Sequence, residues 1–124
     1  MKTAIIVLCV VGALVAQDKP TSLAEARTAV EANMSTPEGK AYDQLFGKEF
    51  LDKHLSTMRQ CKQPSGNDSF WTLMKLARDG AAQEVLFYPT TRMATCARET
   101  LLKSKFSAPP RPGYWVSVYF KISH

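Results

Sequence analysis

The sequence contains few of the side chains that enzymes commonly use for proton transfer or metal binding. Among 124 residues there are two histidines and three cysteines. It has no G-x-S-x-G, H-E-x-x-H, P-loop or Gly-rich dinucleotide-binding sequence, so the common hydrolase, metalloprotease and nucleotide-binding signatures are missing. There is also no C-x-x-C and no closely spaced pair of histidines to indicate zinc. We therefore expect no cofactor and no metal, and predict that the protein is not an enzyme.

One alternative keeps a catalytic role for a histidine. His54 lies in an expected helical stretch, where we predict a surface or boundary position, and His124 is the terminal residue. Glu49 and Asp52 stand three residues apart, a spacing typical of a solvated helix face. A small secreted hydrolase would need His54 and a carboxylate within hydrogen-bond reach in one cleft. That hydrolase, or an inhibitor, stays a third hypothesis.

The chain also lacks a concentrated block of positive charge. Sixteen basic and eleven acidic residues give a formal net charge of +5. The basic residues of the C-terminal half are spread among apolar ones, which favours a solvated face over a nucleic-acid footprint. We therefore predict no nucleic-acid partner. The basic residues concerned are Arg92, Arg98, Lys103, Lys105 and Arg111.

Long apolar runs are confined to the N-terminus. The run Ala4–Ala16 follows a basic residue, and the chain turns polar at Gln17, which is typical of a secretory signal peptide of residues 1–16. Cleavage is expected after Ala16, or less favourably after Ala13. As a helix the run would span about 20 Å, against roughly 30 Å of bilayer hydrocarbon. We expect a secreted or periplasmic protein without a membrane span after cleavage; an uncleaved signal anchor is the alternative.

Signal cleavage would leave two cysteines. Cys61 and Cys96 are then an even pair in an exported protein, where oxidation is the default. A disulfide between them would close a loop of about 35 residues and contribute roughly 4 kcal/mol in the chain-entropy view. Two free buried thiols are the alternative.

Capping and turn residues divide the rest of the chain into six elements. Ser22 with Glu25 forms a capping box, and Thr36 followed by Pro37 starts a second helix. Asp79-Gly80 supplies a hairpin turn. The second helix has a broad apolar stripe, formed by Tyr42, Leu45, Phe46, Phe50, Leu51, Leu55 and Met58. The pattern predicts helices over 22–33, 37–60 and 92–105, and strands over 70–77, 83–88 and 114–123.

These elements predict an α+β fold. Two N-terminal helices precede a ββαβ unit with a small three-stranded antiparallel sheet, and the last helix packs on one sheet face. Residues 17–60 form the helical N-terminal segment and residues 61–124 the ββαβ domain, together one compact domain. The N-terminal helices cover the other face or an edge. The clearest strand is the last, which directs Val116, Val118, Phe120 and Ile122 one way and Trp115, Ser117, Tyr119 and Lys121 the other.

The stretch from Cys61 onward resembles a known family. A cysteine precedes the first strand, Asp79-Gly80 turns into the second, Cys96 lies in a helical stretch, and Ala108-Pro109-Pro110 leads to the apolar last strand. This order of features is similar to the C-terminal domain of TonB, and more closely to its two-cysteine relatives of the AgmX type. Residues 20–60 have no counterpart in that resemblance.

The resemblance implies binding by strand addition, in which an extended protein or peptide segment pairs with an exposed sheet edge. The candidate edge is the last strand, at Trp115, Ser117, Tyr119 and Lys121. TonB itself keeps a membrane anchor and a long proline-rich spacer, which this chain lacks, so we expect no energy transduction. Two alternatives stay open. The protein is a structural envelope-associated one with a covered edge, or Trp115 and Tyr119 seat the helix at 37–60. No feature of the sequence indicates an oligomeric state.

Overall fold

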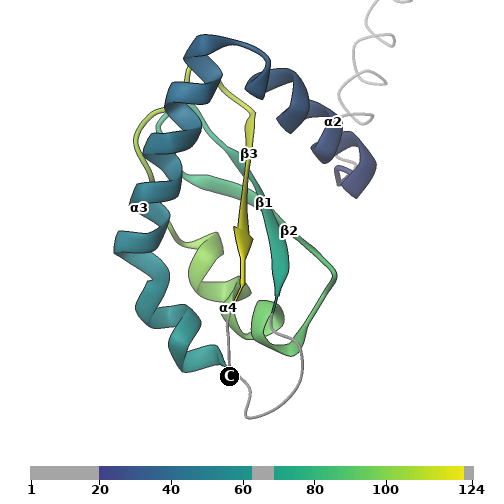
Figure 1. Ribbon diagram of the computed structural model, residues 1–124, viewed down its shortest axis with the longest axis vertical. Coiled ribbons are helices and arrows are strands. Elements are labelled where there is room, and N and C mark those ends of the chain that lie inside the picture. Colours follow the sequence, from purple (N-terminus) through teal and green to yellow (C-terminus); the bar gives the residue numbers. More distant parts are fainter. Residues whose placement is uncertain (1–19, 63–68, 122–124) are drawn as a thin grey trace, which may run out of the picture.

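The computed structural model describes residues 20–62 and 69–121, so the predicted signal peptide lies outside the described residues. The predicted α+β class is confirmed: a three-stranded antiparallel sheet of order β2-β1-β3 packs with three helices (Figure 1). No helix in these two ranges is long and apolar enough to cross a membrane. The elements are α2 (Leu23–Met34), α3 (Pro37–Cys61), β1 (Phe70–Leu76), β2 (Ala82–Tyr88), α4 (Arg92–Leu102) and β3 (Tyr114–Phe120).

The predicted helix starts are confirmed by their caps. Ser22 Oγ accepts a hydrogen bond from the Glu25 amide, and Glu25 in turn accepts one from the Ser22 amide, both at 3.1 Å. Thr36 caps α3 by accepting from the Gly39 amide at 3.0 Å. A Cβ on Gly39 would stand 1.7 Å from the Asn33 carbonyl oxygen. A glycine here therefore lets the end of α2 and the start of α3 approach closely.

The last helix ends earlier than predicted, at Leu102 rather than 105. The chain beyond it turns back and pairs with the β1–β2 turn, where the Phe106 amide donates to the Gly80 carbonyl at 2.9 Å. Gly80 has φ of +91°, and a Cβ there would lie 1.9 Å from the Phe106 carbonyl oxygen. Tertiary pairing with the turn thus overrides the helical pattern at 103–105.

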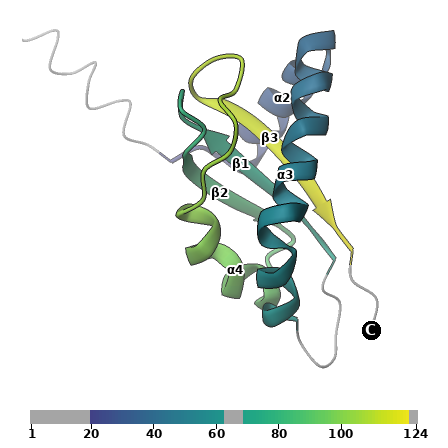
Figure 2. The same ribbon diagram turned by 90° about the vertical axis from the view of Figure 1, so that its left-hand side faces the viewer.

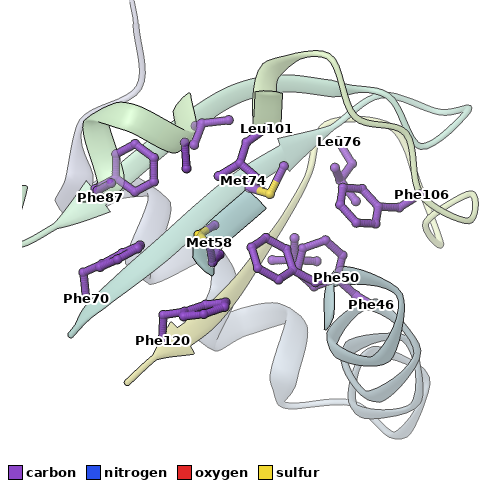
Figure 3. Close-up of a cluster of buried hydrophobic side chains, with 14 of the residues drawn as sticks. Phe46, Phe50, Met58, Phe70, Met74, Leu76, Phe87, Leu101, Phe106 and Phe120 are labelled. Carbon is purple, nitrogen blue, oxygen red and sulfur yellow. The ribbon is translucent and has the colours of Figure 1, made fainter. Parts of the chain in front are cut away.

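The three helices divide between the two faces of the sheet. Side chains of α3, α4 and alternate strand residues form the main core on one face, where Phe50 of α3 contacts Phe120 of β3, and Phe120 in turn contacts Phe70 of β1 (Figure 3). The opposite face carries a smaller cluster under α2, built on Ala26, Leu73 and Trp115. Both N-terminal helices were predicted to cover the face opposite the last helix, or an edge. The prediction is correct for α2, which lies on the far face, and wrong for α3, whose buried rings pack with α4 in the main core.

A disulfide joins the two helices of the main core. Cys61 ends α3 and Cys96 lies in α4, with their Cα atoms 5.6 Å apart, which confirms the predicted pair. The first half of α3 is joined by hydrogen bonds to the connector that precedes β3. Glu49 accepts from the Ser107 amide at 2.8 Å, and Tyr42 donates to the Ser107 carbonyl at 2.6 Å. Glu49 was expected on a solvated face, and instead it anchors this connector.

Removing the disulfide is expected to destabilise the domain without changing its fold. A double variant, Cys61→Ala with Cys96→Ala, should lower the free energy of unfolding by about 2–4 kcal/mol, because the denatured chain loses a cross-link over the 35-residue separation. Urea denaturation monitored by circular dichroism measures this loss. Reducing agent should shift the wild-type midpoint to that of the variant and leave the variant unchanged. Equal midpoints for the oxidised wild type and the variant would contradict a stabilising role.

Candidate binding edge of the sheet

The two outer strands of the sheet differ in how their free edges are covered. Because β1 pairs with both neighbours, β2 and β3 each keep one outer edge. On β2, Arg98 of α4 donates to the Val85 carbonyl at 2.9 Å, and its guanidinium lies 5.0 Å from the Phe87 ring centroid. A side chain of the core helix therefore covers the middle of the β2 edge.

This arginine contact also shows which backbone N–H and C=O groups of the outer strands point away from β1. In an antiparallel pair, a residue directs both its N–H and its C=O to the same side. Val85 directs its carbonyl outward, so Met74, which stands opposite it, pairs on its other side with Val116. Val116 therefore points inward to β1. The residues directly before and after it, Trp115 and Ser117, must then point their backbone N–H and C=O groups to the outer edge of β3.

A second hydrogen bond independently supports this outward direction of the Trp115 backbone. The Asn33 side chain, at the end of α2, donates to the Trp115 carbonyl at 2.9 Å. Asn33 is itself buried, and its oxygen accepts from Arg111. The N-terminal end of the β3 edge is thus closed by α2. Within the described residues β3 forms strand pairs with β1 alone, so the outward backbone groups of Ser117 and Tyr119 lie beyond this cap.

A groove runs beside this uncapped part of β3. α3 and β3 lie side by side and run in the same direction (Figures 1 and 2), and between them is a cavity of about 480 Å³. Its apolar lining from α3 comes from Leu51 and Leu55, both exposed to solvent. Basic side chains gather where both elements end, namely Arg59, Lys62 and Lys121. A segment lying along β3 would therefore contact leucines along its length and positive charge at one end.

The structure divides the four residues predicted for the edge. Trp115 is 5% exposed and packs under α2, so its side chain is not part of an accessible aromatic patch. The predicted alternative seat for it was the helix at 37–60; this is corrected, because the helix that covers it is α2. Ser117 is half-buried, while Tyr119 and Lys121 are exposed, and Tyr119 and Lys121 line the groove.

Sequence reasoning missed three contributors to this edge. Leu51 and Leu55 were counted in the core stripe of α3, yet they lie outside the core. The width of that stripe was the available signal, because at about 100° per residue its positions spread over more than half of the helix circumference, which is wider than one buried face. Asn33 gave no sequence signal, since its role depends on the distant strand that it caps.

His54 was predicted at the surface or at a boundary, and this prediction is wrong. Its side chain is 6% exposed and lies between Phe50 and Phe106, with ring centroids 5.4 and 5.7 Å away. Neither ring nitrogen has a hydrogen-bond partner in the described part of the chain. The pairing of His54 with a carboxylate that the hydrolase hypothesis requires is therefore not formed there. The same ranges contain no group of three or more potential metal ligands.

The buried histidine makes stability depend on pH. Burial lowers the pKa of His54 below its ordinary value of 6.5, and the positive charge of Lys53 lowers it further. Just below pH 6.5 His54 therefore binds a proton in the unfolded chain and stays neutral in the folded protein. The contribution of His54 to stability is complete above pH 6.5, and is lost as pH falls from 6.5 toward the folded-state pKa.

Replacing His54 with leucine should remove this pH dependence. The slope of unfolding free energy below pH 6.5, which reaches at most about 1.4 kcal/mol per pH unit for one proton, should decrease in His54→Leu. Urea denaturation at a series of pH values from about 4.5 to about 8.5, roughly two units on either side of the ordinary histidine pKa, measures the slope. His124→Gln, at the other histidine of the chain, is the control and should keep the wild-type slope. An unchanged slope in His54→Leu would contradict the assignment.

Comparison of the chain with protein-family models, curated proteins and solved structures found no match. The resemblance to the TonB C-terminal domain therefore rests on the order of sequence features from Cys61 onward.

Proposed function

We propose that the protein is an exported, non-catalytic binding module that captures an extended protein or peptide segment by strand addition on β3. The observation that carries this proposal is the pairing of two features on one edge. Backbone groups of Ser117 and Tyr119 point outward, and the groove beside them is lined by exposed leucines. An incoming strand needs both, because main-chain hydrogen bonds supply affinity and alternate side chains need pockets.

The length of the captured segment is set by what covers the edge. Asn33 closes the strand at Trp115, so pairing begins at Ser117 and extends toward Lys121. A segment of a few residues forms a small number of main-chain hydrogen bonds, each contributing about 1 kcal/mol net. Most of the affinity must then come from apolar side chains placed over Leu51 and Leu55. We therefore expect a partner with apolar residues at alternate positions.

The proposed setting is extracytoplasmic and without energy transduction. The Cys61–Cys96 disulfide and the absence of a spanning helix in residues 20–62 and 69–121 are compatible with a secreted or periplasmic location. The signal predicted over residues 1–16 supports the same location. The proposal keeps the binding mode suggested by the resemblance and omits coupling to an energised membrane, because the apolar run in residues 1–16 is predicted to be a cleaved signal.

The second candidate is a structural envelope-associated protein whose sheet edge is covered. The Asn33 cap and the burial of Trp115 favour it, because both close one end of β3. The two candidates differ in whether the backbone at Ser117 and Tyr119 accepts a partner. That difference can be measured directly.

A proline at Ser117 should abolish capture and keep the fold. The Ser117 amide points outward, so Ser117→Pro removes a hydrogen-bond donor for the partner and leaves the β1–β3 ladder intact. Peptides selected from a random display library against the wild-type domain serve as ligands. Their affinity, measured by isothermal titration calorimetry, should fall at least about tenfold in this variant.

Two further variants locate the side-chain contribution. Leu51→Ala should weaken the same peptides, whereas Leu45→Ala, an exposed leucine of the same helix that does not line the groove, should not. Bound peptide should also slow hydrogen exchange of the Tyr119 amide. If the selected peptides bind Ser117→Pro as tightly as the wild type, strand addition at this edge is wrong and the covered-edge candidate is favoured.

A further inference from the structure

The sheet face that carries α2 also carries an exposed row of aromatic side chains. Trp71 on β1 stands opposite Tyr88 on β2 and opposite Tyr119 on β3, so the three residues form one row across all three strands. They are 44, 49 and 48% exposed, respectively. The rings of Trp71 and Tyr119 lie in contact, with centroids 5.0 Å apart. Three large aromatic residues left at the surface in one row indicate a contact surface more than ordinary packing.

Helix α2 forms a wall alongside this row. Thr21, just before the helix, bonds to Glu84 on β2, and Asn33, near its end, bonds to β3. The helix therefore crosses the strands, as the aromatic row does. Between the two is a cavity of about 210 Å³ whose walls include Arg27 and Glu31 on the helix side. The other side is formed by Trp71 and Tyr88, and Leu73 belongs to the lining as well.

The polar groups of this cavity are balanced in charge. The Arg27 guanidinium lies 5.7 Å from the Tyr88 ring centroid, and Glu31 follows one helical turn later. One donor group and one acceptor group thus stand beside aromatic rings, on a chain with a net charge of +5. The local balance fits a neutral ligand that offers both hydroxyl donors and hydroxyl acceptors around an apolar ring face. Pyranose rings have this chemistry, because their C–H faces are apolar and their rims carry hydroxyl groups.

We propose that the cavity between α2 and the aromatic row binds a neutral saccharide, with a sugar ring stacked on Trp71 and its hydroxyl groups bonded to Arg27 and Glu31. A proline-rich peptide fits this cavity less well, because its backbone offers carbonyl acceptors and few donors, and the Glu31 carboxylate would be left without a hydrogen-bond donor. Single-stranded nucleic acid would bring phosphate charge next to the same carboxylate. This site adjoins the strand-addition edge, because Ser117 also lines the cavity and Tyr119 also lines the groove along α3. The side chains proposed to bind the sugar, Trp71, Arg27 and Glu31, do not line that groove.

The test uses the two tryptophans of the folded protein as separate probes. Cellohexaose and chitohexaose are titrated into ¹⁵N-labelled protein, and the two indole N–H resonances are followed. The Trp71 resonance should shift progressively, and by more than that of Trp115, whose side chain is buried under α2 and does not line the cavity. Because Trp71→Ala lacks the reporting indole, binding to the variants is measured by isothermal titration calorimetry. Trp71→Ala should weaken binding at least about tenfold, because it removes the stacking surface.

Glu31→Gln keeps the shape of the wall and should also weaken saccharide binding, while Leu102→Ala, an exposed leucine on α4, should not. Glu31 is an exposed helix residue, so this variant folds even if Trp71→Ala does not. Leu51→Ala should leave saccharide binding unchanged, which separates this site from the strand-addition groove. The proposal is overturned if neither oligosaccharide shifts the Trp71 resonance, or if binding survives in Glu31→Gln and Trp71→Ala. Tighter binding of a proline decapeptide or of oligo-dT at Trp71 would also overturn it.

Discussion

The pairing of β1 on both of its edges is the constraint on which the rest of the structure depends. β1 is the central strand, and its alternate residues Phe70, Thr72, Met74 and Leu76 are completely buried in the main core. The residues between them face α2. A shift of the strand by one position would exchange these two sets and expose the core residues, so its register is strongly specified. Both β2 and β3 inherit their own register from this strand.

The same register decides what the sheet offers to a partner. Because Met74 lies opposite both Val85 and Val116, the outward direction of the Val85 carbonyl implies which backbone groups of β3 point outward. The register also places Trp71 between the two tyrosines of the aromatic row. One strand therefore determines the phase of the β3 edge and the composition of the opposite face, although neither site is formed by β1 alone.

Local signals in the sequence predicted most of the fold. The caps at Ser22 and Thr36, the Asp79-Gly80 turn and the alternation after Gly113 each involve residues close together in the chain, and each produced the expected element. That the last strand would be an edge strand was implied by the family resemblance, and β3 is at an edge of the sheet.

The features that the sequence did not predict depend on residues that are distant in the chain. The end of α4 is set by pairing at Gly80, and the burial of His54 is set by Phe106, which is far along the chain. Trp115 is covered by α2, because small residues of that helix fit against it. The larger apolar side chains of α3 pack instead in the main core. Periodicity identifies an apolar face, but it does not say which sheet face that helix will cover.

The unequal size of the helices explains why both candidate surfaces exist. The buried side of α2 is short and built from small side chains such as Ala26 and Ala29, so it covers only the part of the sheet near Leu73 and Trp115. The aromatic row beside it is left exposed. On the other face the long α3 fills the core and ends beside β3 with Arg59 and Lys62 next to Lys121. Like charges at a free edge oppose pairing between two copies of the same strand. The edge can therefore stay open in solution while it still accepts a segment whose apolar side chains reach the leucines of α3.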